Sequence, residues 1–288
     1  MRAVLVTMKN KHNTWPMLST PHAHTTYVDG INTPEEMVVG AIEKGFVSLG
    51  LSEHGRQGFD EKYCLSEQSE AQYIHDVLRV RAKYSDQLYL YLGIERDAKG
   101  IVDRTKFDYV IGSNHYVGDG TGRFAVDSSI EEVLHGCAKL YGGDWYLMAR
   151  DYFGGLADFI TTYKPDIIGH FDLVTKHNEG MRYFDETDAR YVKCAMEALD
   201  KMAQTDAILE INTGAMARGY RSAPYPGIQF LKHWRARKGR VIISSDCHDV
   251  NKLDFGYDQA HALIKQAGFE TAWALSGEGT GFVEYAVG

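Results

Sequence analysis

The amino-acid sequence predicts an α/β fold in which parallel strands, covered by helices, form a barrel. Seven short apolar runs are each followed by a helix-like segment, and uninterrupted apolar runs are typical of parallel strands buried on both faces. Polar side chains follow most of these runs, and βα barrels carry their active sites at that end of the strands. A doubly wound open sheet is the alternative, although such a sheet usually gathers its site at one switch point.

Length and composition narrow the classes of protein. We expect the 288 residues to form a single domain, because βα barrels often reach this size as one unit. The formal charge of -8 argues against a broad surface for nucleic acid or anionic membrane, and no apolar run is long enough to span a bilayer. The four cysteines lack the spacing of a disulfide framework, and no secretion signal is visible at the N-terminus. We therefore expect a cytoplasmic protein with a small substrate and no nucleic-acid or membrane partner; its oligomeric state stays open.

The first four expected strands all end in residues that can bind a metal ion. These strands are Trp15–Thr20, Phe46–Leu51, Leu88–Ile94 and Phe107–Ser113. The residues at their ends are, in turn, His22 with His24, then His54, Glu95 and His115. Alternate residues of a strand point to the same side, so His22 and His24 can converge on one point. Helices are expected between these strands at Asn32–Gly45 and Ser69–Tyr84.

The second half of the chain continues the same alternation. Its expected strands are Asp166–Gly169, Ala207–Asn212 and Arg240–Ser245, and its expected helices are Thr187–Thr205, Gly227–Arg237 and Gly256–Gly268. The first of these strands leads to His170, the last leads to Asp246 and His248, and the middle one leads to a Gly-rich turn. A further strand is possible at Phe282–Tyr285.

The region of about 118–160 is the least regular part of the sequence. A helix is expected after Asp127-Ser128-Ser129, and a second helix at Tyr146–Thr162 despite its two glycines. The length of this region favours an elaborated loop near the mouth of the active site. Two crossover helices without a lid would produce a similar pattern, and the sequence does not choose between them.

Histidines and acids gather at the strand ends more than random placement would allow. Six of the twelve histidines lie there, namely His22, His24, His54, His115, His170 and His248. Together with Glu95, Asp246 and Asp29 they make nine potential ligands, more than one ion needs. Mixed imidazole and carboxylate ligands suit Zn, Mn or Fe(II). Several divalent ions would also neutralise carboxylates that otherwise repel one another.

These residues lie in motifs that resemble those of the PHP (polymerase and histidinol phosphatase) superfamily. The motifs are His22-Ala23-His24, Ser52-Glu53-His54, Gly93-Ile94-Glu95, Asn114-His115, Gly169-His170-Phe171-Asp172 and Ser245-Asp246-Cys247-His248. The histidinol-phosphatase branch is the most similar, through Gly169–Lys176 and Glu210–Gly214. The resemblance implies a distorted (β/α)7, TIM-like barrel with three divalent metal ions. The implied ligand sets are His22, His24, Glu95 and Asp246 for the first ion, the bridging Glu95 with His115 and His170 for the second, and Asp29, His54 and His248 for the third.

The resemblance also implies the chemistry of phosphomonoester hydrolysis, in which a metal-bridging hydroxide attacks phosphorus. Glu95 and Asp246 would hold the catalytic ions, while Lys176 and Arg218 would bind the phosphate. Arg221 and Arg150 compete for that last role. The sequence does not identify the acid that protonates the leaving group.

Three smaller expectations concern neighbours of the ligands. Glu53 and Asp172 each lie beside a ligand histidine and are expected to orient its imidazole. Cys247 lies between two ligands, and on an extended segment its side chain would point away from both, so we expect a small packed thiol.

The preferred hypothesis is a metal-dependent phosphatase for L-histidinol phosphate in histidine biosynthesis. A first alternative keeps the chemistry but acts on another small phosphomonoester or a nucleotide, because fold and metals do not fix the substrate. Two further alternatives are an amidohydrolase-like enzyme that cleaves C–N bonds and a non-catalytic metal-binding module. The complete set of ligands speaks against the last of these.

Overall fold

A mostly parallel sheet forms the centre of the computed structural model, which describes residues 17–119 and 122–288. The order of the nine strands is β1-β2-β3-β4-β7-β8-β9-β10-β11. Their bounds are β1 (Ser19–Thr20), β2 (Ser48–His54), β3 (Tyr89–Asp97), β4 (Tyr109–Ser113), β7 (Ile167–Ile168), β8 (Ile208–Asn212), β9 (Val241–Ser244), β10 (Thr271–Leu275) and β11 (Phe282–Ala286). All seven expected strands are present, although the start of the first one lies outside the described residues.

Neighbouring strands from β1 to β10 are parallel, and only the pair of β10 and β11 within this sheet is antiparallel. An isolated parallel bridge joins Ala23, after β1, to Cys247, after β9. The backbone N–H of His24 donates to the carbonyl of Cys247 across this bridge (2.8 Å). The predicted α/β fold is therefore confirmed. The closed (β/α)7 barrel stays a prediction, because β9 lies in the sheet between β8, with which it pairs from Val241 to Ser244, and β10, with which it pairs at Ile242.

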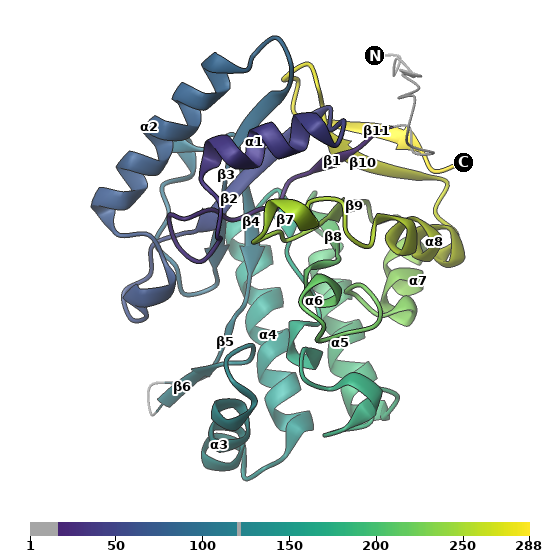
Figure 1. Cartoon of the computed structure of the whole chain (residues 1–288). Coiled ribbons are helices and arrows are strands. Elements are labelled where there is room, and N and C mark those ends of the chain that lie inside the picture. Colours follow the sequence, from purple (N-terminus) through teal and green to yellow (C-terminus); the bar gives the residue numbers. More distant parts are fainter. Residues whose placement is uncertain (1–16, 120–121) are drawn as a thin grey trace.

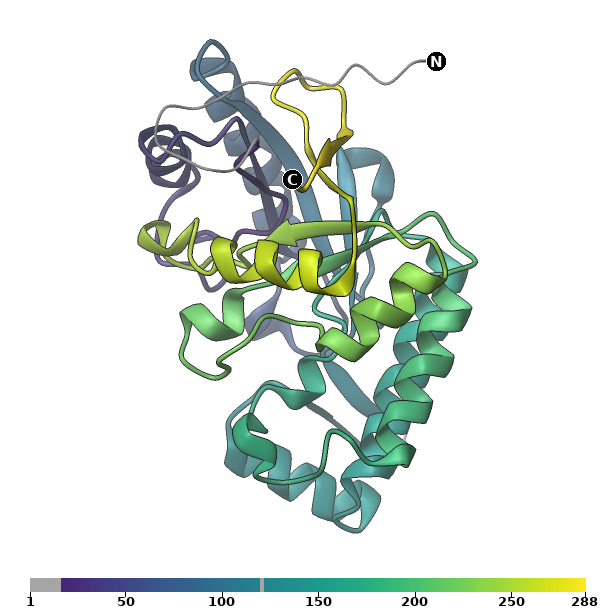
Figure 2. The same ribbon diagram turned by 90° about the vertical axis from the view of Figure 1, so that its right-hand side faces the viewer.

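Besides the helix Ile130–Tyr141 (α3), which is described below, the described part of the chain contains six helices of eight or more residues. Their bounds are α1 (Pro34–Glu43), α2 (Glu67–Lys83), α4 (Trp145–Tyr163), α5 (Ala189–Met202), α7 (Ile228–Ala236) and α8 (Tyr257–Ala267). Figures 1 and 2 show α1 and α2 over the first strands, and α4 beside α5 along the opposite part of the molecule. None of the described helices combines the length and hydrophobicity needed to cross a membrane.

The start of α1 shows how local sequence sets these elements. The Thr33 hydroxyl accepts from the backbone N–H of Glu36, and the Glu36 carboxylate accepts from the backbone N–H of Thr33. This reciprocal pair satisfies two helix N–H groups, and Pro34 needs no partner at the first helical position. The expected helix start is confirmed.

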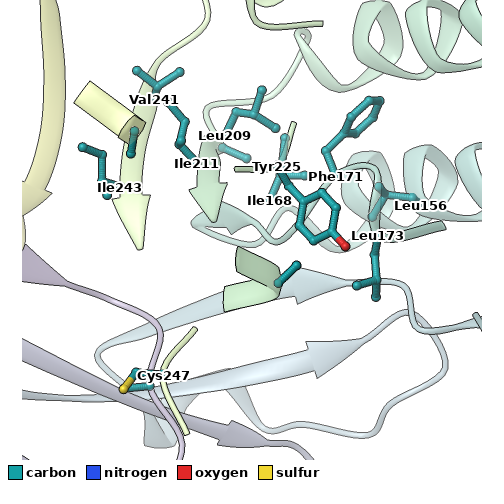
Figure 3. Close-up of a cluster of buried hydrophobic side chains, with 14 of the residues drawn as sticks. Leu156, Ile168, Phe171, Leu173, Leu209, Ile211, Tyr225, Val241, Ile243 and Cys247 are labelled. Atoms are coloured by element: carbon teal, nitrogen blue, oxygen red, sulfur yellow. The ribbon is translucent and has the colours of Figure 1, made fainter. Parts of the chain in front are cut away.

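A buried apolar cluster lies between the sheet and the α4 side of the molecule (Figure 3). Labelled members from the strands are Ile168 of β7, Leu209 and Ile211 of β8, and Val241 and Ile243 of β9. Phe171 and Tyr225 come from loops, and Leu156 comes from α4. This packing fixes the strands immediately below the ends that carry the polar residues.

Cys247 is buried at the edge of the same cluster (Figure 3). Its thiol donates to the carbonyl of Asp249 (2.8 Å), and burial raises the pKa of Cys247 to about 12. A neutral, packed thiol is what the sequence led us to expect at this position.

The region of 118–160 combines features of both expected alternatives. It contains a hairpin of β5 (Tyr116–Asp119) and β6 (Gly122–Ala125), then α3 (Ile130–Tyr141), before α4 packs against α5. Both expected helices are confirmed, whereas the sequence did not indicate the hairpin. The close approach of its strands requires glycine, because a Cβ on Gly118 would lie 2.3 Å from the carbonyl oxygen of Gly122.

Two other differences concern the second half of the chain. No sequence pattern indicated β10, which pairs in parallel with β9 and in antiparallel orientation with β11. The turn expected after β8 contains a short helix, α6 (Gly214–Ala217). Both elements depend on contacts with segments that are distant in the sequence, so local patterns were a poor guide to them.

Candidate metal centre

The ends of six parallel strands bring all nine expected ligands together. Those on strands are His54 at the end of β2 and Glu95 near the end of β3; those on loops are His22, His24 and Asp29 after β1, His115 after β4, His170 after β7, and Asp246 and His248 after β9. Parallel strands end at one edge of a sheet, so a motif at each strand end becomes part of one cluster. This arrangement follows from the topology and not from proximity in the sequence.

One part of the cluster surrounds one oxygen of Glu95. Glu95 Oε2 lies 3.3 Å from His22 Nε2 and 3.7 Å from His24 Nε2. Asp246 Oδ1 lies 3.7 Å from His22 Nε2 and 3.4 Å from His24 Nε2. Two imidazole nitrogens therefore face two carboxylates across a small gap.

The other oxygen of Glu95 faces a second group of imidazoles. Glu95 Oε1 is 2.9 Å from His170 Nε2 and 3.5 Å from His115 Nε2. His54 Nδ1 reaches Oε2 at 2.8 Å. Glu95 is thus shared between the two groups, a geometry suited to a bridging ligand.

A third group lies nearer to solvent, around Asp29. Asp29 Oδ2 is 3.2 Å from His248 Nε2 and 3.6 Å from His54 Nε2, and Asp29 Oδ1 is 3.8 Å from His24 Nδ1. Burial alone would raise the pKa of Asp29, but these histidines lower it, so the side chain is a carboxylate. The structure thus brings Asp29, from the loop after β1, to the cluster.

Three sets of donor atoms are close enough to share metal ions. Within each set the donors lie within 4.8 Å of one another, and the sets are His22, His24 and Asp246; His54, Glu95 and His115; and His24, Asp29, His54 and His248. Mixed nitrogen and oxygen donors suit Zn and related divalent ions.

The buried donors also show that the residues fit such ions. Among the described residues, His22 Nε2 and both ring nitrogens of His24 have no hydrogen-bond partner although they are buried. Buried polar atoms without partners are rare, because each costs roughly 1–3 kcal/mol. A divalent cation bound by His22 Nε2 and His24 Nε2 would satisfy these two atoms.

Charges within the cluster shift the ionisation of its members. Burial alone would raise the pKa of Glu95, but the adjacent imidazoles, chiefly His22 and His54, hold it well below its usual range. Conversely, burial would lower the pKa of His22, whereas Glu210 and Glu95 raise it well above its usual value. The cluster therefore keeps its carboxylates charged even without help from a metal.

Glu210, at the centre of β8, supports two ligands from below. Its Oε1 accepts from His22 Nδ1 (2.6 Å) and from the Ser244 hydroxyl (2.5 Å), and its Oε2 accepts from the backbone N–H of His170 (2.6 Å). A carboxylate acceptor at Nδ1 requires the proton there, which leaves His22 Nε2 free to face the cluster. No role for Glu210 was predicted from the sequence, where the available signal was its place in the motif Glu210–Gly214, within an apolar run.

Two further carboxylates lie behind ligand histidines. Asp97 Oδ2 accepts from the backbone N–H of His115 (2.8 Å) and lies 3.3 Å from its Nδ1. Glu53 Oε1 accepts from the backbone N–H and the hydroxyl of Thr25, and its Oε2 is 3.8 Å from His24 Nδ1. Glu53 therefore holds the loop that carries His24. The role of Asp97 behind His115 was not predicted from the sequence.

Asp172 does not orient an imidazole, so that expectation was wrong. Its Oδ2 accepts from the backbone N–H of Gly227 (3.0 Å), while its Oδ1 and His170 Nδ1 have no hydrogen-bond partner in the described residues. Burial raises the pKa of Asp172 to about 7. The side chain turns toward the loop before α7, a contact that spacing within the motif could not indicate.

The two expected phosphate-binding cations lie beside the cluster. Lys176 Nζ donates to the backbone carbonyl of Asp127 (2.6 Å), and the lysine lines the main cleft. Arg218 donates to Asp246 Oδ2 (3.0 Å) and lies 2.9 Å from His248 Nδ1. Arg218 thus contacts two of the expected ligands directly.

Their two competitors have other roles. Arg221 donates to Glu186 Oε1 (2.9 Å) and to the carbonyl of Thr175 (3.1 Å), and so ties two loops together. Arg150 lines a separate pocket beside α4. Neither side chain is placed to contact the cluster.

The backbone around Asp246 is unusual. Asp246 has φ +44°, in the left-handed region that side chains other than glycine rarely adopt. A Cβ on Gly214, at the start of α6, would lie 2.8 Å from Asp246 Oδ2. A glycine at this position is therefore needed for Asp246 to reach the cluster.

A cleft of about 1530 Å³ opens above the cluster. Glu95, His54 and His115 lie in its floor, Lys176 is on one side, and residues of the β5–β6 hairpin and α3 form the opposite wall. Figure 1 shows the hairpin and α3 projecting beyond the main sheet. The elaborated region of 118–160 thus contributes directly to the cleft.

Fold and site define an α/β protein with a histidine- and carboxylate-rich candidate centre for divalent metal ions at its strand ends. The family model described as PHP domain matches residues 21–214. The chain belongs to the PHP domain family.

Proteins similar to this chain carry related names. A protein of Schizosaccharomyces pombe named a probable histidinol-phosphatase is 24% identical over 279 residues, covering 88% of this chain and 87% of that protein. A structure from Listeria monocytogenes, determined as a candidate histidinol phosphatase, superposes with a TM-score of 0.73 at 20% identity and covers 83% of this chain and 98% of its own. The histidinol phosphate phosphatase of Lactococcus lactis, complexed with zinc, L-histidinol and phosphate, gives a TM-score of 0.61 at 20% identity, covering 90% of this chain and 97% of its own. At these identities the structural matches support the fold alone.

Proposed function

We propose that this protein is a metal-dependent phosphomonoesterase that hydrolyses L-histidinol phosphate to L-histidinol and phosphate. The observation that carries the proposal is the convergence of buried, unpartnered imidazole nitrogens of His22 and His24 on Glu95, which lines the cleft. The names of the S. pombe and L. lactis proteins support this choice of substrate among the phosphomonoesters.

We assign the nine ligands to three divalent ions, which would be Zn, Mn or Fe. The proposed sets are His22, His24, Glu95 and Asp246; Glu95, His115 and His170; and Asp29, His54 and His248. Such ions, when bound, lower the pKa of water and neutralise charge on phosphoryl oxygens. His24 and His54 each lie near two of the three groups in the structure, so an ion on either side would draw its ring to one of them.

The chain itself supplies the fixed charges around the phosphate. Lys176 points into the cleft next to the cluster and offers an ammonium group to the phosphoryl oxygens. Arg218 holds Asp246 in place through its donated hydrogen bond, and its partly exposed guanidinium adds positive charge at the rim. Together they attract a phosphate to the ions and fix its orientation.

The test of this function is phosphate release from purified, metal-analysed protein. L-histidinol phosphate would be compared with nucleotides and sugar phosphates at equal concentration. We expect kcat/KM for L-histidinol phosphate to exceed the others by at least ~100-fold, about 2.7 kcal/mol of discrimination between transition states. Comparable turnover of the other esters would remove L-histidinol phosphate as the substrate, and release of ammonia or amine without phosphate would exclude a phosphatase.

A matched pair of variants ties the activity to the cluster. His22→Ala removes a buried ligand, whereas His75→Ala removes an exposed histidine of α2 outside the site. We expect the first variant to lose activity and bound metal while keeping its circular dichroism spectrum, and the second to behave like the unmodified protein. Unchanged turnover in His22→Ala would contradict the assignment of this metal site.

A further inference from the structure

Asp127 lies on the cleft wall between β6 and α3, facing the candidate metal centre. The backbone N–H of its neighbour Val126 donates to the carbonyl of His115 (2.8 Å), which holds this wall against a strand end that carries a ligand. The Asp127 side chain is 31% exposed and lines the cleft together with His115 and Lys176. Of the acidic residues that line this wall, Asp127 is thus the nearest in sequence to His115, the expected ligand that follows β4.

Lys176 and His177, which follow β7, hold the segment of Asp127 and Ser128 in place. Lys176 Nζ donates to the backbone carbonyl of Asp127 (2.6 Å), and His177 Nε2 donates to that of Ser128 (2.8 Å). Both contacts use main-chain oxygens, so the Asp127 carboxylate is not needed to hold the loop. Within the described part of the chain, its one ion pair is with Lys176, whose Nζ lies 4.0 Å from Oδ2.

A carboxylate at this place opposes the binding of a phosphate alone. When Lys176 binds a phosphoryl group, the Asp127 carboxylate and the phosphate dianion interact with the same ammonium group. Like charges a few ångströms apart in a partly buried site repel one another and weaken binding. Such an acid favours binding only when the substrate carries its own cation next to the phosphate.

We propose that Asp127 binds an ammonium group adjacent to the phosphoester and so selects 2-aminoalkyl phosphates over other phosphomonoesters. This inference rests on the proposed function, because L-histidinol phosphate carries its ammonium group on the carbon next to the one that bears the ester oxygen. The ammonium and phosphoryl groups of such a molecule must bind side by side. Asp127 and Lys176 are arranged side by side in the same way, with opposite charges.

The rest of the cleft leaves room for a substituent on the amino-bearing carbon. Beyond Asp127 the cleft continues along the β5–β6 hairpin, where Phe124 and Tyr116 are among its lining residues. The substrate would therefore place its phosphate at the ions, its ammonium group at Asp127, and its imidazole in this outer part.

Asp127→Asn tests the proposal because it removes the charge and preserves the shape and the main-chain contacts. The matched control is Glu131→Gln, an exposed acid four positions later that lines the same cleft. Each metal-loaded variant would be assayed with L-histidinol phosphate and with 3-(imidazol-4-yl)propyl phosphate, which differs only by lacking the amine. A second pair, 2-aminoethyl phosphate and ethyl phosphate, poses the same question without the imidazole.

We expect Asp127→Asn to lower kcat/KM for the amino member of each pair about 30-fold, the scale of a lost charge-assisted contact, and not to lower it for the member without amine. Glu131→Gln should leave both ratios within about 2-fold of the unmodified enzyme, as expected of an exposed charge. Equal losses for both members of a pair in Asp127→Asn would overturn the proposal, as would an unmodified enzyme that shows no preference for the amino member.

The proposed function fails by a different result. If the unmodified enzyme prefers 2-aminoethyl phosphate to ethyl phosphate but hydrolyses L-histidinol phosphate no better than sugar phosphates, the substrate assignment is wrong while Asp127 keeps its role. Preference for L-histidinol phosphate, with amine selectivity unaffected by Asp127→Asn, would support the function and overturn the role of Asp127.

Discussion

The inner and outer halves of the candidate metal centre differ in burial. In the inner half, the side chains of His22, Glu95 and His170 are at most 3% exposed. In the outer half, those of Asp29, His54 and His248 are 34%, 20% and 21% exposed. Charges in the inner half are little screened by solvent, so their interaction with a cation is stronger there than at the rim.

The two halves also differ in what holds their side chains. Glu210 fixes the ring of His22 from behind, and Asp97 does the same for the segment of His115. In the outer half, Asp29 and His248 contact each other, and the group behind His248 is Arg218, whose side chain is itself 32% exposed. A ligand held by a separate buried group is oriented before the ion arrives, which raises affinity. We therefore expect the inner ions to be held tightly and the outer ion to exchange readily.

The largest effect is expected from Glu95→Gln. Glu95 contacts imidazoles on both of its oxygens, and the neutral amide cannot bridge two cations. Activity should fall by at least ~10³-fold, and bound metal should drop in elemental analysis, with an unchanged circular dichroism spectrum. A variant that retained full metal content and turnover would show that the inner half is not the catalytic centre.

Glu210→Gln should weaken the inner half without removing a ligand. The amide keeps the size of the side chain but loses the charge that stabilises the His22 tautomer, so metal affinity should fall about 10- to 100-fold in a chelator competition. Glu70→Gln is the control, since Glu70 is buried in α2 and pairs with Lys106 away from the cluster. Equal loss of metal in both variants would point to a general effect on the fold.

Asp29→Asn should affect the outer half alone. We expect one equivalent of metal to be lost at low free metal, with activity reduced about 10-fold and restored by added metal, because an exposed ligand set loses affinity without losing its shape. Metal titration with parallel activity assays measures both quantities. If added metal failed to restore activity, Asp29 would have a role beyond binding this ion.

The smallest effect on activity is expected from Tyr73→Phe in α2. The Tyr73 hydroxyl donates to the carbonyls of Leu51 (2.7 Å) and Gly93 (3.0 Å), on the strands that lead to His54 and Glu95. Its loss should lower the free energy of unfolding by about 1 kcal/mol in urea while kcat/KM stays within about 2-fold. A larger loss of activity would mean that both halves depend on the precise seating of these strands.

Local patterns predicted most of the elements and indicated where to look for the site. The residues Thr33–Glu36 are sufficient to predict the start of α1, and the strands β2, β3 and β8 can be recognised from their apolar composition. The strands β5, β6 and β10 could not be recognised in this way, because their pairing partners decide whether they form. The ligand roles of the strand-end residues stay predictions, although the structure brings all nine together.

The sequence by itself determined the alternation of strands and helices and the placement of histidines and acids at strand ends, because periodicity and helix capping act over a few residues. Only the tertiary structure decided which groups support which ligands. Glu210 meets His22 across 188 positions of chain, Asp172 turns to Gly227 instead of to an imidazole, and Asp127 lies beside Lys176 from the other side of the cleft. Such contacts depend on how the fold brings distant strand ends to one edge of the sheet. Patterns within a few neighbouring residues cannot predict which of these side chains will meet.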